Sequence, residues 1–392
     1  MVKLKRTLNT FQVSLYGIGT ILGAGIYSLI GKISATSGVL APVSFMLSAL
    51  IASLTAISYS QLVKLHPKSA GEAEYVYQGF KNIGLSNLVG WLVAFTGVIS
   101  ASTLTKAFIG YFKVLIDIPN SLIATLVILV ITLLAIKGIK ESINLIIIFT
   151  LIEVTGLILV CLVAWPELVE SNFMIPKMLE NISWDKSQSI LAGAFIAFYA
   201  FIGFEDMVNL AEETTVARVT ISRSIYIALI TSTILYILVA IVAISSIPLN
   251  KLNTSPAPIK DMYVHHGGDP FVIGLIGSFA IFNGIMAQVI MGSRILYGLR
   301  HPFKWMSFLS VVNKKTKTPI NATIVIAVVI TILISFFELK SLAMATSFII
   351  LIIFTLVNTS LVLIRIKNRQ IKVKYLWTPI LAVIVNILFL II

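Results

Sequence analysis

The chain consists of long apolar runs separated by short polar segments. The runs are roughly 20 residues long, which is the length that an α-helix needs to cross a bilayer, and they recur almost evenly along the sequence. They predict an all-α integral membrane protein, with residues 1–392 as a single polytopic domain and about eleven transmembrane helices. The predicted helices are 9–31, 39–63, 86–113, 121–136, 143–165, 189–211, 222–247, 271–299, 320–337, 341–364 and 375–392.

The first apolar run contains the stretch Gly17-Ile18-Gly19-Thr20-Ile21-Leu22-Gly23-Ala24-Gly25-Ile26-Tyr27, with four glycines in nine residues. Each glycine weakens a helix by about 1 kcal/mol relative to alanine, so we expect the first helix to be broken here. Unwound backbone at bilayer depth is tolerated only where it is buried in protein or lines a wet cavity. The stretch therefore predicts a binding site.

The sixth run holds a second candidate break, Phe198-Tyr199-Ala200-Phe201-Ile202-Gly203-Phe204-Glu205-Asp206, with one glycine and two carboxylates. The two breaks begin two sets of five helices, at about 9–165 and 189–364, and leave one extra helix at 375–392. Interrupted helices in corresponding positions are typical of transporters built from inverted repeats, with the site at the repeat interface. The alternative is that the glycines only let helices pack closely.

The two breaks differ in the charge that they attract. A half-helix that begins near Gly25 presents free N–H groups and the positive end of its dipole, which suits a carboxylate. A half-helix that ends near Ile202 presents free C=O groups, which suits an ammonium group. Together they predict a zwitterionic substrate such as an α-amino acid.

Composition excludes a soluble globule, because 58% of residues are hydrophobic, 11% are charged and the mean hydropathy is +1.01. The net charge of +13 follows membrane topology: most lysines and arginines fall in segments that the helix count places inside when the N-terminus is cytoplasmic. We therefore expect a lipid bilayer and no nucleic acid as partner. The start, Met1 to Arg6, resembles a signal-peptide n-region, but the run that follows is too long and has no cleavage pattern.

Two charged residues lie within predicted helices. Glu153 is in the middle of the fifth run, where a bare carboxylate costs several kcal/mol. We expect it to bind and release a coupling proton; the alternative is a neutral acid that hydrogen-bonds a neighbouring helix. Lys106 in the third run is expected to take part in coupling or substrate contact, or to extend its ammonium group to the outer interface. Glu205 and Asp206 are expected to cap the second half-helix or line an inner gate.

The first-run and sixth-run stretches, Asn283 to Tyr297 and Thr318-Pro319-Ile320-Asn321-Ala322 resemble the amino acid-polyamine-organocation permeases. The resemblance covers nearly the whole chain. It implies a leucine-transporter-like fold of two inverted five-helix repeats with alternating access. It also implies that substrate contacts are made by Ile21, Gly23, Ala24 and Gly25, by the carbonyls of Tyr199, Ala200 and Ile202, and by the aromatic gating residues Phe201 and Phe204.

The chain departs from the family pattern after the acidic pair Glu212-Glu213, after the eighth helix, and in having no twelfth helix. These departures concern loops and oligomeric contacts. Several branches of the family have a lysine where this chain has Glu153, beside the place where sodium binds in sodium-driven relatives. The resemblance therefore implies that Glu153 replaces an ion.

The sequence thus predicts a secondary active amino acid transporter of the plasma membrane, driven by protons or by exchange. The expected pocket walls are small or apolar, which favours a neutral substrate: Ala101, Ser102, Thr105, Phe201, Asn283 and Met286. Alternatives are a polyamine or amine transporter and, further off, a membrane receptor for amino acids or a channel. No cofactor, metal site or enzyme constellation is expected. The individual amino acid, the direction of transport and the oligomeric state stay open.

Overall fold

The computed structural model describes residues 6, 8–68, 71–137, 139–170, 186–299, 304–313, 315–316, 318–367 and 376–391. These residues form a helical bundle, and the only β-type pairing among them is an isolated bridge between Leu8 and Thr214. The long helices are α1 (Thr10–Ser37), α2 (Ala41–Leu65), α4 (Ile83–Phe112), α5 (Asn120–Lys137), α6 (Ile139–Glu170), α9 (Ala217–Ser246), α12 (Pro270–Gly298), α13 (Ile320–Phe336), α14 (Leu339–Lys367) and α15 (Trp377–Ile391).

Shorter elements connect or complete these helices. The sixth span consists of α8 (Ser187–Phe198), η3 (Tyr199–Phe201) and η4 (Glu205–Leu210). The other short elements are η1 (Gly38–Leu40), α3 (Gly71–Phe80), α10 (Leu249–Thr254), α11 (Pro258–His265) and η5 (Lys304–Ser310). None of these short elements was among the helices predicted from the apolar runs.

The predicted spans match the helices of the bundle. Among the described residues, eight stretches are long and apolar enough to cross a membrane, and one of them, Gly25–Leu65, takes in the part of α1 from Gly25 onward and all of α2. The shorter apolar helices α13 and α15 coincide with the ninth and eleventh predicted runs. The prediction of an all-α membrane fold is therefore confirmed.

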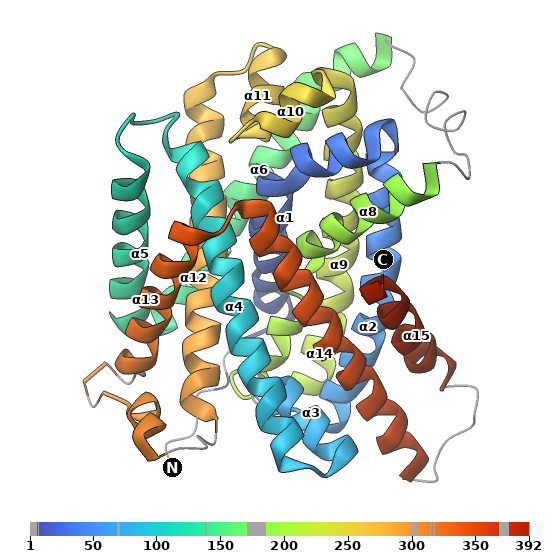
Figure 1. Cartoon of the computed structure of the whole chain (residues 1–392), viewed down its shortest axis with the longest axis vertical. Helices are drawn as coiled ribbons and strands as arrows, with labels where there is room; N and C mark the ends of the chain where they lie inside the picture. The colour runs from blue at the N-terminus through green and yellow to red at the C-terminus, as the bar shows by residue number, and fades with distance from the viewer. Residues whose placement is uncertain are drawn as a thin grey trace.

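Figure 1 shows α1 in the middle of the bundle, with α5 and α13 at one flank and α15 at the other. The helices α10 and α11 lie at the upper end, and α3 lies at the lower end. Members of the two predicted sets pack pairwise: α1 against the sixth span, α2 against α9, and α4 against α12. Because α1 is central, any site in the middle of the bundle borders on it.

Local sequence explains where several helices begin. The Asn9 side chain accepts a hydrogen bond from the N–H of Gln12 (3.0 Å), and the Gln12 side chain accepts one from the N–H of Asn9 (3.2 Å), which is a capping box. Asp269 caps α12 through the N–H of Phe271 (2.8 Å), with Pro270 as the first helical residue. Such caps satisfy N–H groups that the helix leaves free.

The predicted break in the sixth span is confirmed. Helical backbone stops after Phe201, Ile202 is extended, and Gly203 has a φ of +130°, a conformation that side chains disfavour. The N–H of Gly203 donates to Oε2 of Glu205 (2.9 Å). Glu205 therefore satisfies an N–H group within the break, whereas η4 itself has no side-chain cap.

The predicted break in the first span is not observed, because α1 is helical from Thr10 to Ser37. Figure 1 shows that its upper part turns toward α2. In an apolar environment a broken helical hydrogen bond finds no water to replace it, which outweighs a glycine penalty of about 1 kcal/mol per residue. The glycines serve the alternative that we described, close packing of helices.

Gly25 makes the closest of these contacts. A Cβ atom at Gly25 would lie 2.1 Å from both Cα and Cβ of Ala200, so any side chain would push α1 away from the broken span. Gly23 faces the carbonyl of Ala280 in α12, where a Cβ would lie at 2.9 Å. The glycines of α1 thus bring its backbone against the backbone of two other spans.

We expect Gly25→Ala to lower the free energy of unfolding by about 1–3 kcal/mol, because the backbone of Ala200 cannot move aside as a flexible side chain would. Gly292→Ala is the matched control: its Cβ would meet only the end of the Ile326 side chain, at 3.1 Å. Alanine there should be neutral or stabilising by up to about 1 kcal/mol. Thermal unfolding of both variants in detergent tests this, and a Gly25→Ala protein as stable as the wild type would contradict it.

Candidate functional site

The candidate site lies where α1 meets the break in the sixth span. The hydroxyl of Thr20 donates to the carbonyl of Gly203 (3.1 Å), and a Cβ on Gly203 would lie 2.7 Å from the backbone carbonyl of Thr20. Together with the contact between Gly25 and Ala200, this brings the two predicted stretches together over residues 20–25 and 200–203. Residues 200–203 lie within the candidate membrane span Ser187–Leu210, and Gly25 is the first residue of the candidate span Gly25–Leu65.

Two backbone carbonyls converge on one side chain at this junction. The hydroxyl of Tyr236, on α9, lies 2.7 Å from the carbonyl oxygen of Ile21 and 2.7 Å from that of Ala200. The carbonyl of Ala200 points away from its own helix, because the N–H of Gly203, which would close the next turn, binds Glu205. Ile21 and Ala200, which the sequence assigned to opposite breaks, thus form one pair of acceptors.

The remaining predicted substrate residues of the sixth span have different surroundings. The Tyr199 carbonyl accepts from the N–H of Ile202 (3.2 Å), and its hydroxyl lies 2.9 Å from Oγ of Ser100. The ring of Phe201 packs on Tyr236 with centroids 5.1 Å apart, beside the two carbonyls. The ring of Phe204 packs instead against Phe354 of α14, at 5.3 Å. Of the two predicted gating residues, only Phe201 is adjacent to the carbonyl pair.

The predicted contact residues of α1 have the following surroundings. Ile21 is fully buried, Gly23 faces α12, and Gly25 faces Ala200. Ala24 is part of α1, but its side chain lies outside the described residues. The six expected wall residues Ala101, Ser102, Thr105, Phe201, Asn283 and Met286 are all buried.

Glu153 lies on α6, which packs against α1. Its side chain is fully buried, and neither carboxylate oxygen has a hydrogen-bond partner among the described residues. The hydroxyl of Tyr27 donates to the backbone carbonyl of Glu153 (3.1 Å), so this acid lies on the part of α6 that contacts α1.

One turn before Glu153, Thr150 continues this contact. Its hydroxyl would lie 1.9 Å from a Cβ on Gly19, and it accepts a hydrogen bond from Nδ2 of Asn283 (3.3 Å). The Oδ1 atom of Asn283 is buried without a partner among the described residues. Polar atoms from α6 and α12 thus lie against α1 near Gly19.

The family model for amino acid permeases, described as "Amino acid permease", matches residues 8–392. The chain belongs to this family. The predicted resemblance to amino acid-polyamine-organocation permeases is therefore confirmed, and the family consists of transporters rather than enzymes.

Curated relatives of this permease carry different cargo by name. A cationic amino acid transporter of Arabidopsis thaliana, named as mitochondrial, is 25% identical over 93% of this chain and 63% of its own length. A methylthioribose transporter and a branched-chain amino acid permease, both of Bacillus subtilis, are each 25% identical, over 95% and 93% of this chain and 84% and 82% of their own lengths. The permease thus spans less than two thirds of its plant relatives, which include a vacuolar cationic amino acid transporter covered over 64%.

Lys106 of the permease is not part of the carbonyl junction. It is half-buried on α4, one turn before Gly110, and no hydrogen bond or ion pair is recorded for it within the described chain. A Cβ at Gly110 would lie 2.2 Å from the carbonyl of Pro256 in the segment between α10 and α11. Lys106 therefore lies toward the end of the bundle that α10 and α11 cover.

Both ends of the junction are covered. At the upper end, a Cβ on Gly31 of α1 would lie 2.1 Å from the carbonyl of Leu252 in α10, and the Lys32 ammonium donates to the carbonyl of Asn253. At the lower end, Leu8 exchanges backbone hydrogen bonds with Glu213 and Thr215, each 3.1 Å long. These contacts cover the junction at both ends among the described residues, and we call this arrangement closed.

Below the junction lie three buried carboxylates, Glu72 of α3 and Glu205 and Asp206 of η4. Asp206 accepts a hydrogen bond from Nε2 of Gln288 (3.0 Å), and Glu72 accepts one from the hydroxyl of Tyr59 (3.3 Å). The charge of Glu72 acts on both other acids. Sequence reasoning missed Glu72, because this residue lies outside the predicted membrane spans.

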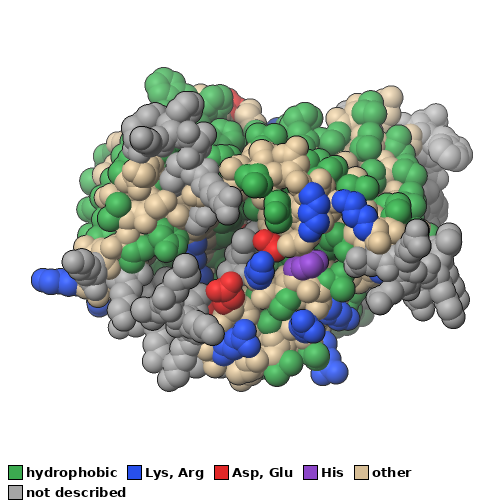
Figure 2. Space-filling model, turned by 90° about the horizontal axis from the view of Figure 1, so that it is seen from below, with side chains coloured by type: hydrophobic (Ala, Val, Ile, Leu, Met, Phe, Trp, Pro, Cys, Tyr) green, Lys and Arg blue, Asp and Glu red, His purple; other side chains and the backbone are tan. Residues whose placement is uncertain are grey.

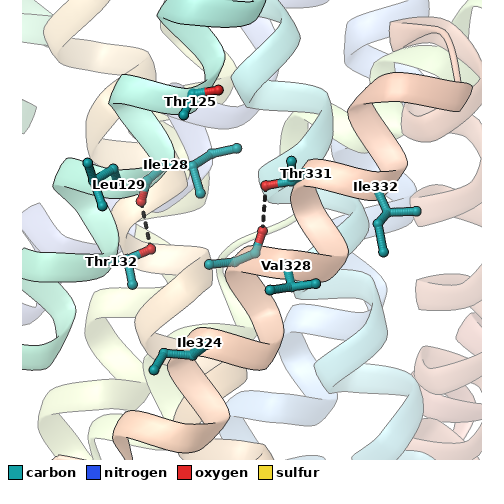
Figure 3. A pocket seen from close by; sticks show the side chains of 9 residues that line it. Thr125, Ile128, Leu129, Thr132, Ile324, Val328, Thr331 and Ile332 are labelled. Atoms are coloured by element: carbon teal, nitrogen blue, oxygen red, sulfur yellow. Dashed lines mark hydrogen bonds between the residues drawn. The ribbon is translucent and has the colours of Figure 1, made fainter.

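The apolar groove between α5 and α13 is a different kind of site. It has a volume of about 350 Å³ and is lined by isoleucine, leucine, valine, alanine and threonine side chains. Figure 3 shows the hydroxyls of Thr132 and Thr331 turned to carbonyls of their own helices, Ile128 (2.6 Å) and Ala327 (2.9 Å). With its polar groups satisfied internally, this groove suits a lipid chain and not a zwitterion.

Tyr236 is the other residue that sequence reasoning missed. A tyrosine in the middle of the apolar run 222–247 was a usable signal, because a buried tyrosine hydroxyl usually finds a hydrogen-bond partner. The sequence does not say which partner, since Ile21 lies 215 positions away. Only the fold brings the two together.

We expect the stability of the permease to fall with rising pH through the titration of Glu72. Burial raises the pKa of Glu72 from 4.5 to about 7, although hydrogen bonds from its own N–H and from Tyr59 oppose the shift. Between those values the folded protein holds a proton that the unfolded chain has released, so stability is lost as pH rises. The difference between the two pKa values corresponds to roughly 3 kcal/mol in the free energy of unfolding. Glu72→Gln should remove this loss between about pH 5 and pH 8.

The matched control is Glu74→Gln on the same helix. Burial opposes ionisation of Glu74, but hydrogen bonds from Lys68 and Gln78 outweigh it, and its pKa is lowered. Glu74 therefore titrates below this window, and its variant should keep the wild-type slope of melting temperature against pH. Equal slopes in the wild type and Glu72→Gln would contradict the assignment.

Proposed function

We propose that the chain is a secondary active transporter of neutral α-amino acids that works by alternating access. The observation that carries the proposal is the pair of convergent carbonyls, from Ile21 and Ala200, at the centre of a closed bundle. Carbonyl oxygens at the end of a half-helix attract a cation, and an α-ammonium group is the common metabolite group that two neutral acceptors suit. Membership of the amino acid permease family supports the same cargo class.

The substrate carboxylate is proposed to bind at Ile21, Gly23, Ala24 and Gly25 of α1. Its glycines lower the cost of local unwinding, and unwinding on substrate binding would free N–H groups for an anion. The carbonyls of Tyr199, Ala200 and Ile202 are proposed to face the amine, with Phe201 and Phe204 as gating residues. In this scheme binding loosens α1 at the point where Gly25 touches Ala200.

The walls support a neutral side chain. The hydroxyls of Ser102 and Thr105 are already bonded to carbonyls of their own helix, at 2.8 and 2.7 Å, and no wall residue is charged. One named relative is a branched-chain amino acid permease, whereas others are cationic amino acid transporters. We therefore take L-leucine as the first probe, with L-arginine, putrescine and methylthioribose as comparators.

Glu153 is proposed to couple transport to protons, with Lys106 as a second coupling residue nearer the upper end. An ionised carboxylate without partners at this depth costs several kcal/mol, so Glu153 is proposed to carry a proton in this closed conformation. Its release on one side and uptake on the other would tie a proton to each cycle. Exchange of amino acids is the alternative drive and needs no such acid.

The lower face in Figure 1 is proposed to be cytoplasmic, in the plasma membrane, with the N-terminus on that side. Figure 2 shows Lys and Arg side chains spread over this face, with few acidic ones. The described basic residues at the helix ends on this face are Lys64, Lys68, Lys81, Lys137, Arg218, Arg223, Arg294, Arg365 and Lys367. An excess of such residues marks cytoplasmic loops. We further propose that residues 1–392 are one domain, with repeats at about 9–165 and 189–364.

The test of the cargo is counterflow in proteoliposomes. Vesicles loaded with unlabelled L-leucine should accumulate external labelled L-leucine well above protein-free vesicles, and L-arginine and putrescine should compete at least about tenfold less well. Competition by methylthioribose as strong as that by leucine would indicate a cargo outside the amino acids. Absence of leucine exchange by folded protein would contradict the proposal for neutral amino acids.

The test of coupling is Glu153→Gln. We expect an inward proton gradient to raise leucine accumulation in the wild type and to have at least about tenfold less effect in the variant, while exchange without a gradient persists. Glu338→Gln, an exposed carboxylate between α13 and α14, controls for loss of one negative charge. Full gradient-driven uptake by Glu153→Gln would exclude this acid as the proton carrier.

A further inference from the structure

The apolar groove between α5 and α13 has a buried floor and an open side. Its floor includes Ile128 of α5, which is 7% exposed, whereas Leu129 of α5 and Val328 of α13 are 52% and 53% exposed. Figure 3 shows these side chains on the two facing helices. The groove, with its volume of about 350 Å³, is therefore a recess in the outer flank of the bundle and not an enclosed cavity.

The lining of the groove favours an apolar occupant. Its polar side chains are Thr125, Thr132 and Thr331, and each hydroxyl donates to a carbonyl of its own helix, at 2.8, 2.6 and 2.9 Å. The other lining side chains are aliphatic. Since every hydroxyl hydrogen is already used, a polar ligand gains no donor here, and contact with hydrocarbon leaves no hydroxyl hydrogen unpaired.

The groove is also narrow. On α5 its lining runs from Thr125 to Thr132, which is about 10 Å along the helix. An α-helix with its side chains is about 10 Å across, so a 10 Å length of it occupies roughly 800 Å³. This is more than the groove holds, so a single flexible hydrocarbon chain fits the space better than a further helix does.

The lower end of the groove is closed by a polar contact. The hydroxyl of Thr318, two residues before α13, donates to the carbonyl of Ile136, one residue before the end of α5 (2.8 Å). The two helices are thus joined here, and the groove lies above this contact. Thr132 is five residues from the end of α5, so the lining begins about 8 Å from that end.

Two lysines lie at this closed end. Lys137 is the last residue of α5, and Lys315 lies in the turn before α13, where its N–H donates to Oδ1 of Asn313 (2.9 Å). Both lysines are exposed. In addition, α13 begins without a side-chain cap, so the positive end of its dipole adds to the charge of the lysines. The groove therefore has apolar walls and a positively charged lower end.

The distance between the charge and the groove matches the shape of a phospholipid. The lining covers the part of α5 that lies about 8–18 Å from Lys137. One leaflet contributes about 15 Å of hydrocarbon, half the thickness of the bilayer core. An acyl chain attached to a phosphate beside Lys137 would therefore run along the groove, and basic residues at the membrane surface attract anionic headgroups.

We propose that this groove binds one acyl chain of an anionic phospholipid, whose headgroup is held at the lower end by Lys137 and Lys315. The lipid would join α5 to α13 on the flank formed by α4 and α12. A symmetric second copy of the chain fits less well, because it would bring its own two lysines to the same membrane depth, where like charges repel. This lipid site is separate from the junction of α1 with the sixth span, and it does not depend on which substrate is carried.

The first experiment measures lipid binding to the purified wild type by native mass spectrometry. The two probes are dioleoylphosphatidylglycerol and dioleoylphosphatidylcholine, which share their acyl chains and differ in the net charge of the headgroup. We expect the first phosphatidylglycerol to bind with a dissociation constant at least about fivefold lower than that of phosphatidylcholine, and raised salt to reduce this preference. Equal binding of the two lipids by the wild type would overturn the proposal.

The second experiment fills the groove with Val328→Phe. Because Val328 is exposed, the larger side chain can extend into the groove without displacing the core. We expect the dissociation constant of the first phosphatidylglycerol to rise at least about fivefold. Val130→Phe is the matched control, since Val130 is 44% exposed on α5 and does not line the groove. Wild-type affinity in folded Val328→Phe, or an equal loss in both variants, would show that the lipid binds elsewhere.

The third experiment removes the charge at the lower end. The double variant Lys137→Gln and Lys315→Gln should bind the two lipids within about twofold of each other, because only the apolar contact remains. The control double variant, Lys64→Gln and Arg218→Gln, removes two exposed positive charges from the same face, away from the groove, and should keep the wild-type preference. A preference for phosphatidylglycerol that survives in the first double variant would contradict the assignment of the headgroup.

Thermal unfolding gives a second measure of binding. Phosphatidylglycerol should raise the melting temperature of the wild type and of Val130→Phe more than phosphatidylcholine does, and this difference should be lost in Val328→Phe. A wild type that is dimeric in the mass spectra, becomes monomeric in Val328→Phe and has no headgroup preference would replace the lipid with a second copy of the chain. Failure of leucine exchange would leave all of these results unchanged, so the lipid site and the proposed function are tested separately.

Discussion

Every backbone polar group at the centre of a membrane bundle must find a partner within the protein, because lipid offers none. The break in the sixth span is where this chain meets that constraint with side chains in place of its own helix. Glu205 takes the N–H of Gly203, Thr20 takes its carbonyl, and Tyr236 takes the carbonyl of Ala200. The break is therefore stabilised by side chains from its own span, from α1 and from α9.

The sequence predicted the spans and the second break because both follow from local properties. Apolar length specifies a span whatever packs against it, and a glycine followed by two acids cannot continue an apolar helix at low cost. The first span shows where local reasoning ends. Its glycines are compatible with an unwound segment and with close packing, and the choice depends on Ala200 and Ala280, which lie far along the chain. The partner of Tyr236, 215 positions away, is beyond any local pattern for the same reason.

The buried acids also differ in whether local sequence reveals them. Glu153 was recognised because a carboxylate within an apolar run is conspicuous, and its burial without partners makes it the acid with most to gain from a bound proton. Glu72 was missed because α3 is short, polar and outside the spans, yet the fold packs it beneath Tyr59 and beside the two acids of η4. The hydrophobic pattern identifies a charged residue within an apolar run. It does not identify a charged residue in a polar segment that becomes buried only through tertiary packing.

The pairing of Leu8 with Glu213 and Thr215 bears on how the bundle is assembled. Leu8, two residues before α1, leaves the ribosome some 200 residues ahead of its backbone partners. The other surfaces that α1 needs, on the sixth span, α9 and α12, are also synthesised in the second half of the chain. During biosynthesis the first span must therefore wait in the bilayer with the faces of Gly23 and Gly25 uncovered, although α6 is already present to cover Gly19, and the bundle is complete only when the later spans arrive.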